Sequence, residues 1–372
     1  MRGTASSRSS RAIPEVEARE FTPGLELARA FYEEVVASLL GGVEHSAALL
    51  GHGSDVLGFD TTRSTDHAWG PRLEVFVAEA DVARVASLVE KGMPDEFRGW
   101  PTRFGWDDVA VTHHVEVTTL DAWLRNRLGF DPTQPIALES WLATPQQVLL
   151  EVTEGAVFRD ADGALAEARE ALAWYPRDVW VWLLACQWRR IDQEEPFVGR
   201  TAEVGDELGS RVLCTRLVRD AMRLCFLLER RYAPYPKWLG SGFRRLRACE
   251  ELGPLLEAAL AANDYAEREP ALIEAMEALA RLHNAAGVTS PVDEASRHFY
   301  DRPFRVLGSG RFVTACLEQV AGERLRALPL VGGIDQFVDS TDLLAYPRTF
   351  EKLAETYRAW LADPDARSRV LI

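Results

Sequence analysis

The spacing of apolar residues divides the chain into a first part that alternates between helix and strand and a second part that is almost wholly helical. From Gly24 to Leu40 apolar residues recur every three or four positions, which predicts a helix. The short apolar run Ala47–Leu50 predicts a buried strand that ends at Gly51. Leu73–Val77 alternates as a strand, and Val82–Val89 returns to helical spacing. This succession indicates a small α/β unit.

A third strand is predicted from Val109 to Val117, where valines occupy one face and polar residues occupy the other. The polar face carries Thr112, His114, Glu116 and Thr118. A helix over 120–128 follows. If the polar face is directed toward Asp66, in the loop that precedes the strand Leu73–Val77, Glu116 is a candidate acidic ligand for a metal ion. The alternative is a strand residue that simply contacts solvent.

Beyond a predicted linker at 131–135, helical spacing continues almost to the end of the chain. The predicted helices are Trp141–Glu151, Gly163–Trp174, Val179–Ile191, Leu208–Arg231, Gly242–Asn263, Glu269–Ala286, Gly310–Leu325 and Thr349–Leu361. Tyr175-Pro176 and Glu195-Pro196 are predicted helix stops. We therefore expect a disordered lead over residues 1–20, an α/β domain with a small mixed sheet over 21–135, and a larger α-helical domain over 136–372.

Length and composition agree with a two-domain globular protein. The chain has 372 residues and is 47% hydrophobic, which is enough to bury two cores. No apolar run approaches the ~20 residues that a membrane-spanning helix needs, and MRGTASSRSSR lacks the hydrophobic segment of a secretory signal. A cytoplasmic location without a membrane partner is expected. The five cysteines are widely spaced and are predicted to be reduced packing residues.

The charge is acidic overall but uneven along the chain. A formal net charge of -15 makes a long nucleic acid an improbable partner, because such binding needs a basic face. Between residues 200 and 250, however, eleven lysines and arginines stand against six acidic residues. This basic stretch would suit a triphosphate or a short RNA segment. The alternative is a solvated helix face whose charges are balanced elsewhere.

Candidate chemistry is concentrated between Gly51 and Arg72, in the sequence GHGSDVLGFDTTRSTDHAWGPR. Gly53-Ser54 predicts a tight turn whose backbone N–H groups can hold anionic oxygens. Asp66 follows behind a loop rich in serine and threonine, where a carboxylate could hold a hard cation. The alternative is an ordinary Gly-Ser turn followed by a Ser-Thr-Asp helix cap.

This stretch resembles the signature of the polymerase-β-like nucleotidyltransferase superfamily, which consists of Gly-Ser, a variable loop, Asp-x-Asp and a third acid on a later strand. Gly53, Ser54 and Asp66 match, but the second aspartate is replaced by Ala68, which cannot bind a metal. The segments GFD, DHAWGPR and YAPYPKWLG are also similar to an uncharacterised bacterial family described only as a domain of unknown function.

The resemblance implies transfer of a nucleoside monophosphate from an NTP, most simply ATP, to an acceptor with release of pyrophosphate. Mg²⁺ would be held by Asp66 and Glu116, with position 68 completing the catalytic set, while Gly53 and Ser54 hold the phosphates. The acceptor could be a small molecule, a protein side chain or an RNA 3′ end.

The resemblance also assigns contacts to the helical part. Lys237 would contact the triphosphate, and Tyr235 or Trp238 would stack on the base. Arg216 and Arg219, with Arg223, share one helix face and could line the same cleft. The alternative for the aromatic residues is plain core packing.

Ala68 leaves three interpretations open. The residue could have been altered to silence an enzyme, the protein could bind nucleotide without turnover as a sensor or partner-binding module, or Asp55, Asp60 or His67 could supply the missing ligand. The histidines near the motif match no zinc pattern. An active parent enzyme is the preferred hypothesis, and a noncatalytic nucleotide-binding protein is the alternative.

Overall fold

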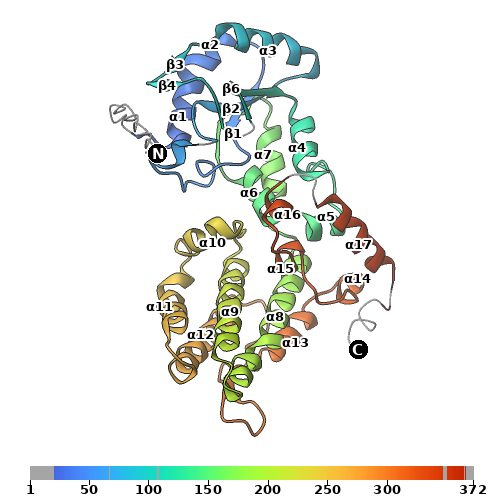
Figure 1. Cartoon of the computed structure of the whole chain (residues 1–372). Coiled ribbons are helices and arrows are strands. Elements are labelled where there is room, and N and C mark those ends of the chain that lie inside the picture. The colour runs from blue at the N-terminus through green and yellow to red at the C-terminus, as the bar shows by residue number, and fades with distance from the viewer. Residues whose placement is uncertain (1–20, 67, 107–108, 347–349, 364, 366–372) are drawn as a thin grey trace, which may run out of the picture.

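The computed structural model describes residues 21–66, 68–106, 109–346, 350–363 and 365 (Figure 1). Their main sheet has five strands in the order β5-β6-β2-β1-β7. These strands are β1 Ser46–Leu49, β2 Arg72–Phe76, β5 Arg103–Trp106, β6 Val109–Thr118 and β7 Ala156–Arg159. Two small ribbons pair β3 Glu96–Phe97 with β4 Trp100–Pro101, and β8 Arg297–His298 with β9 Arg305–Val306. The predicted lead over 1–20 lies outside the described residues.

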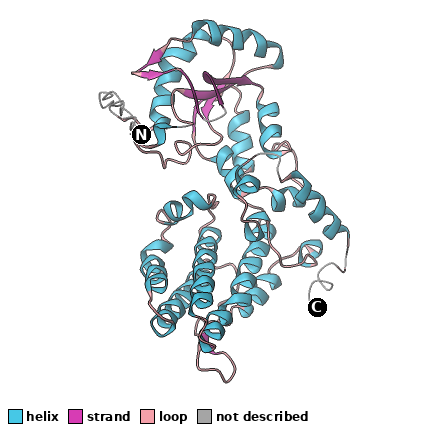
Figure 2. Cartoon of the chain, in the orientation of Figure 1, coloured by secondary structure: helices cyan, strands magenta, loops and turns pink. Residues whose placement is uncertain are grey.

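Helices surround this sheet and make up most of the rest of the described chain (Figure 2). Those before β7 are α1 Gly24–Phe31, a π-turn Tyr32–Val36, α2 Ala37–Leu39, a 3₁₀ turn Ser64–Asp66, α3 Glu79–Gly92, α4 Leu120–Leu128, α5 Leu138–Ala143 and α6 Gln146–Thr153. Those after β7 are α7 Ala164–Ala171, α8 Arg177–Glu203, α9 Glu207–Leu228, α10 Pro236–Phe243, α11 Ala248–Ala261, α12 Tyr265–Ala285, α13 Gly310–Glu318, α14 Glu323–Arg326, α15 Ile334–Phe337, α16 Thr341–Ala345 and α17 Glu351–Ala362. None of these described helices is both long and apolar enough to cross a membrane.

The sheet is mixed, and its register sets the polar residues of neighbouring strands side by side. β2 and β6 are parallel, with Arg72 opposite His114 and Glu74 opposite Glu116, whereas the other neighbouring strands are antiparallel. Because side chains alternate across a strand, β2 presents Leu73 to one face and Glu74 to the other. The face of Leu73 packs in one apolar cluster with α1 and α3. The opposite face meets α4 and α6.

The expected combination of a mixed sheet with many helices is confirmed, and the strands predicted at 47–50, 73–77 and 109–117 are β1, β2 and β6. β7 was not predicted. It pairs with β1 through Ala48 opposite Val157 and Leu49 opposite Ala156, and so adds an edge strand to the sheet. The predicted boundary at residue 135 therefore lies inside the stretch of chain that completes the sheet.

The prediction that Glu195-Pro196 ends a helix is wrong, because α8 continues through Pro196 to Glu203. A proline inside a helix costs about 3 kcal/mol, chiefly by removing one backbone hydrogen bond. Packing outweighs that cost, since Ile191 and Val198 are buried on either side of the proline and α8 packs against α9 and α13. Pro176, by contrast, precedes the first turn of α8 as predicted.

Some predicted helices are interrupted. Trp141–Glu151 divides into α5 and α6 at Thr144-Pro145, because a proline fixes the extended backbone that begins a new helix. Gly310–Leu325 divides into α13, which ends at Glu318, and α14, which begins at Glu323 directly after Gly322. In Figure 1, α10 lies below the sheet and faces the loop that follows β1, and α15 and α16 lie beside α6.

Candidate functional site

The candidate site is the turn from Gly51 to Asp55 that follows β1. Gly51 has φ +80° and its N–H donates to the carbonyl oxygen of Glu151 at 2.7 Å, which fastens the turn to α6. Gly53 has φ +142°, and a Cβ there would lie 2.2 Å from Asp55 Oδ1 and 2.3 Å from Arg72 Nη2. Glycine is therefore the residue that this close approach permits.

A buried ion pair holds the turn against β2. Arg72 donates from Nη2 to Asp55 Oδ1 at 2.7 Å and from Nε to Asp55 Oδ2 at 3.2 Å. Nη2 of the same guanidinium also donates to the carbonyl oxygen of His52 at 2.8 Å. Both side chains are buried. Removing either partner would leave an unpaired buried charge, so the pair fixes the shape of the turn.

The Gly51–Asp55 turn has hydrogen-bond donors that are without an acceptor among the described residues. The backbone N–H groups of His52, Gly53 and Ser54 and the Ser54 hydroxyl donate to no acceptor among the described residues. The Ser54 carbonyl oxygen, on the other side, accepts from Phe59 N at 2.7 Å. His52, Gly53 and Ser54 all reach the surface. Adjacent N–H groups in such a turn form a concave site for anionic oxygens.

Behind the turn, the polar face of the sheet carries buried charge. Glu74 accepts from Leu50 N at 2.9 Å, and burial raises the pKa of Glu74 to about 7 although Arg72 and Arg127 oppose that change. Arg127 donates to Glu151 at 2.7 Å, and burial raises the pKa of Glu151 as well. Two guanidiniums therefore lie under the turn, one partnered by Asp55 and one by Glu151.

His52 lies at the rim of this cluster with part of its ring in solvent. Burial against the protein lowers the pKa of His52 below its ordinary value, and the nearby charges of Arg72 and Arg127 lower it further. The imidazole is therefore neutral at pH 7. The positively charged groups of this cluster are therefore Arg72 and Arg127, and not His52.

The predicted metal ligands belong to no group of three such side chains among the described residues. Asp66 ends an exposed 3₁₀ turn, Ala68 has φ +50°, and Glu116 is exposed on β6. Among the described residues, no group of three His, Cys, Asp or Glu side chains is placed to hold a metal ion. The binding of Mg²⁺ by Asp66 and Glu116 remains a prediction.

The residues proposed to replace the missing aspartate have other partners. Asp55 is bound to Arg72, and Asp60 Oδ2 accepts from Gly24 N at 2.7 Å and from Trp69 Nε1 at 3.0 Å. His67 lies outside the described residues. Neither described aspartate is therefore placed as a substitute ligand.

The basic residues predicted on α9 are paired. Arg216 Nε donates to Glu194 at 2.8 Å, Arg219 donates to Asp339 at 2.7 Å, and Arg223 donates to the carbonyl oxygen of Asp335. The ion pairs of Arg216 and Arg219 reduce the charge that was expected to attract a triphosphate. Their roles as phosphate contacts remain predictions.

The predicted residues near α10 are only partly brought together. Lys237 is exposed at the first turn of α10, with Nζ 5.0 Å from the Trp238 ring. Trp238 stacks on Phe59 with ring centroids 5.2 Å apart, so it packs against the loop that follows the turn. Tyr235 N donates to Gln147 Oε1 at 3.2 Å. Contacts of Lys237 and Tyr235 with a nucleotide remain predictions.

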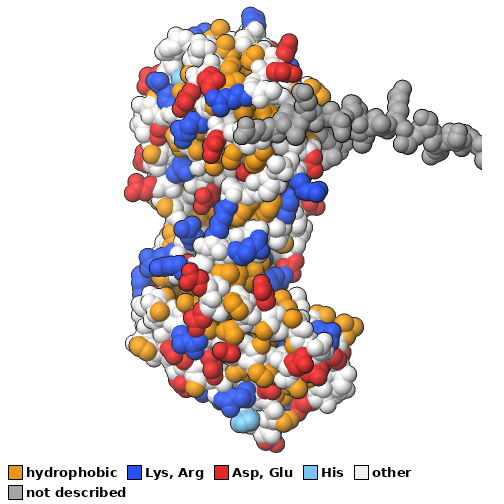
Figure 3. All heavy atoms as spheres, turned by 90° about the vertical axis from the view of Figure 1, so that its left-hand side faces the viewer, with side chains coloured by type: hydrophobic (Ala, Val, Ile, Leu, Met, Phe, Trp, Pro, Cys, Tyr) orange, Lys and Arg blue, Asp and Glu red, His pale blue; other side chains and the backbone are white. Residues whose placement is uncertain are grey.

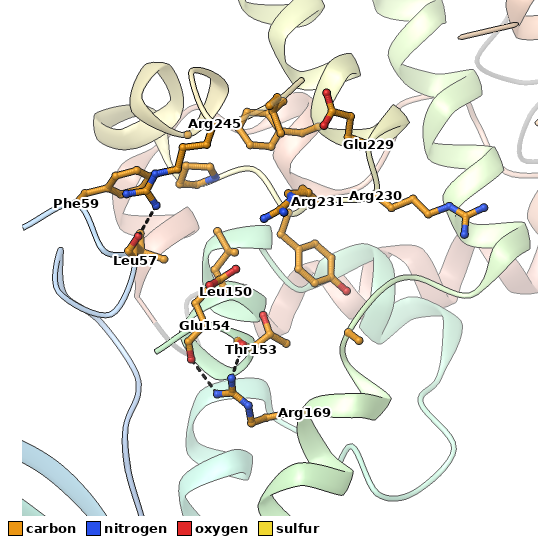
Figure 4. Close-up of a pocket in the computed structure, with 16 residues that line it drawn as sticks. Leu57, Phe59, Leu150, Thr153, Glu154, Arg169, Glu229, Arg230, Arg231 and Arg245 are labelled. Atoms are coloured by element: carbon orange, nitrogen blue, oxygen red, sulfur yellow. Dashed lines mark hydrogen bonds between the residues drawn. The ribbon is translucent and has the colours of Figure 1, made fainter. Parts of the chain in front are cut away.

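A pocket of about 540 Å³ opens between the loop after the turn and the helices (Figure 4). It is lined by residues of that loop, of α6 and α7, and of the segment that joins α9 to α10. None of the predicted site residues lines it. Figure 3 shows lysine and arginine side chains gathered along the narrowed middle of one face, where the sheet part meets the helical part.

Two features were missed by sequence reasoning. Glu74 alternates with apolar residues in a predicted strand, and that alternation was a usable signal for a polar face. The pocket had no comparable signal, because its walls combine segments that are distant in the sequence, such as 57–59, 150–154 and 226–246.

Comparison with known proteins gives a weak structural likeness and a partial family match. No curated protein matches the chain. The crystal structure of a nucleotidyltransferase-like protein from Exiguobacterium sibiricum 255-15 aligns with 74% of this chain and 83% of that chain, with 14% identity and a TM-score of 0.31. Residues 141–239, from α5 into α10, match the family DUF4037, a domain of unknown function. The similarity to an uncharacterised family described only as a domain of unknown function is therefore confirmed over residues 141–239.

Proposed function

We propose that this protein binds a nucleoside triphosphate at the Gly51–Asp55 turn, as a nucleotidyltransferase-like protein whose catalytic set is incomplete. The observation that carries the proposal is the row of N–H groups at His52, Gly53 and Ser54 that have no acceptor among the described residues. Phosphate oxygens are the acceptors that such a row suits. The Ser54 hydroxyl would supply one more donor.

The surroundings of the turn support an anionic ligand. The Arg72–Asp55 pair holds the donors in place before any ligand arrives, which reduces the ordering cost of binding. Arg72 and Arg127 lie behind the turn, but each is paired with a carboxylate, so the proposed attraction for phosphate comes from the N–H groups of the turn. Lys237 is the further phosphate contact that we propose, and ATP is the nucleotide that we propose.

In this proposal Mg²⁺ is bound together with the nucleotide, through its phosphates. Among the described residues no group of three His, Cys, Asp or Glu side chains is placed to hold an ion, and we propose that Mg²⁺ arrives with the nucleotide. Mg²⁺ is commonly bound through substrate phosphates together with one or two carboxylates. Asp66 and Glu116 are the carboxylates that we propose for that contact.

Nucleotidyl transfer is a second candidate function, favoured by the backbone at residue 68. Ala68 has φ +50°, a conformation in which aspartate and asparagine are several-fold enriched compared with most residues other than glycine. The position thus suits the aspartate that the superfamily signature places there. We propose that the chain with alanine at this position binds nucleotide without turnover.

Binding is tested by calorimetric titration of ATP, GTP, CTP and UTP, each with and without Mg²⁺. Ser54→Asp should weaken binding at least tenfold, because a carboxylate beside the donors repels phosphate. Ser54→Ala is the matched control and should weaken binding only several-fold, since one hydroxyl contact is lost. No saturable binding by the unmodified protein, or equal affinities for both variants, would contradict the proposed site.

Transfer is tested separately with Ala68→Asp, by measuring pyrophosphate release from the bound NTP. Release that appears with this variant, and that is lost again when Asp66→Asn is added, would support an enzyme. Continued silence with unchanged nucleotide affinity would support the noncatalytic alternative.

A further inference from the structure

The 540 Å³ pocket below the turn has the size and lining of a site for a small organic molecule. Leu57, Leu150, Phe226 and Leu246 contribute apolar walls, and Tyr232 contributes an aromatic ring. The Tyr232 hydroxyl is already used, since it donates to the carbonyl oxygen of Leu172 at 2.9 Å. The walls therefore offer an apolar surface on which a ring or hydrocarbon body can pack.

Charge in this pocket is predominantly positive and is not neutralised by ion pairs. Its lining includes four arginines, Arg169, Arg230, Arg231 and Arg245, against the two glutamates Glu154 and Glu229. None of these arginines forms a salt bridge among the described residues. On α9, by contrast, the arginines at 211, 216 and 219 are each paired with a carboxylate. In a chain of net charge -15, an unneutralised group of arginines attracts an anion.

Three of these arginines have other partners that fix them in the walls. Arg169 donates to three carbonyl oxygens at the end of α6, at 2.6 to 2.9 Å. Arg245 donates to the carbonyl oxygens of Leu57, at 2.8 Å, and of Gly58, and its guanidinium lies 3.9 Å from the centre of the Phe59 ring. Arg230 stacks on the Trp180 ring at 4.2 Å.

Arg231 differs from the other three. Its side chain has no hydrogen bond or ion pair with any described residue. Figure 4 shows Arg231 extended toward the Leu57 and Phe59 side of the pocket, whereas Arg230 is turned the other way. An exposed guanidinium that lines a partly apolar pocket and has no partner among the described residues is suited to bind a carboxylate or a phosphate.

We propose that this pocket binds a small organic anion, whose phosphate or carboxylate contacts Arg231 and whose apolar body packs against Tyr232 and Leu150. The fixed charges of Arg169 and Arg245 strengthen the attraction without needing to move. This site is distinct from the Gly51–Asp55 turn, since no residue of 51–55 lines the pocket, and it does not depend on nucleotide binding.

The test uses the full chain and 1-naphthyl phosphate as the probe, titrated by calorimetry, with inorganic phosphate and 1-naphthol as comparison ligands. The unmodified protein should bind naphthyl phosphate saturably and at least tenfold more tightly than either comparison ligand. Arg231→Gln should weaken that binding about tenfold, because one charge-assisted contact is lost. Arg324→Gln, an exposed arginine on α14 outside the pocket, is the matched control and should change nothing.

Several outcomes would overturn the proposal: no saturable binding of naphthyl phosphate, equal affinity for 1-naphthol, or no change with Arg231→Gln. Ser54→Asp distinguishes this site from the proposed nucleotide site, because it should weaken ATP and leave naphthyl phosphate unaffected. If ATP affinity instead falls with Arg231→Gln and not with Ser54→Asp, the pocket is the nucleotide site and the two-site proposal is wrong.

Discussion

Arg72 and Glu74 show how charged residues can be accommodated inside a central strand. Both are buried on the polar face of β2, and each is bonded to the segment that follows β1. Arg72 reaches Asp55, and Glu74 accepts from Leu50 N. A buried charge is tolerated only where it is paired and hydrogen-bonded, so these two residues determine the path of the turn.

The carboxyl group of Glu74 should make stability depend on pH. Burial raises its folded pKa to about 7 from an ordinary value of 4.5. A raised pKa means that its stabilising contribution is fully present below pH 4.5 and is lost as pH rises through 7. Glu74→Gln removes this group, so the free energy of unfolding of the variant should improve relative to the unmodified protein between pH 5 and 8, by at most ~3 kcal/mol.

Urea unfolding at pH 5, 6, 7 and 8 measures this difference. Glu44→Gln is the control, because Glu44 is exposed and lies outside the helices and strands. Parallel pH profiles for the unmodified protein and Glu74→Gln would show that folding does not raise the pKa of Glu74.

At the scale of the elements, the position of β7 depends on the close packing of Gly155, directly before the strand, against Leu49. Gly155 has φ +77°, and a Cβ there would lie 2.1 Å from the carbonyl oxygen of Leu49. Its N–H donates to the Val56 carbonyl oxygen at 3.0 Å. The glycine thus lets the chain leave α6 and enter the sheet edge beside β1.

Gly155→Ala should therefore detach or strain β7. Gly163 provides a matched comparison, since it has φ +78° but a Cβ added there would meet nothing within 4 Å. Gly163→Ala should cost ~1 kcal/mol for the left-handed backbone alone, and Gly155→Ala should cost several kcal/mol more because backbone atoms must also shift. Thermal unfolding of both variants checks this expectation, and equal losses would contradict the close packing of Gly155 against Leu49.

Elements with long regular patterns could be predicted from the sequence, and elements fixed by distant contacts could not. The alternation over 109–117 identified β6, and the helical spacing over 208–231 identified α9. β7 has only four residues and joins a partner strand more than 100 residues away, so no local pattern marks it. For the site, the turn at Gly53 was predictable from its residue types, but its bond to β2 through Arg72 was visible only in three dimensions.

Across the whole molecule, one face of the sheet shares an apolar core with the later helices, whereas the other face packs in a separate cluster with α1 and α3. A single cluster of buried residues includes Leu50 and Phe76 from the sheet part and Trp182 and Leu224 from α8 and α9. Phe76 packs edge-on against Trp123 of α4, with ring centroids 5.7 Å apart. The segment 136–175 lies between the two parts and contributes α5, α6, β7 and α7 to this shared region.

A shared core predicts that the sheet and the helical part unfold together. Hydrogen exchange followed by mass spectrometry in increasing urea should show that amides of β1 and β2 lose protection at the same urea concentration as amides of α8 and α9. If the sheet behaved as an independent unit that ends near residue 135, its amides would exchange at a separate, lower concentration. Loss of protection at the same urea concentration would mean that the candidate site folds only together with the helical part. Glu151 of α6 provides the structural link, because it accepts hydrogen bonds from both Gly51 and Arg127.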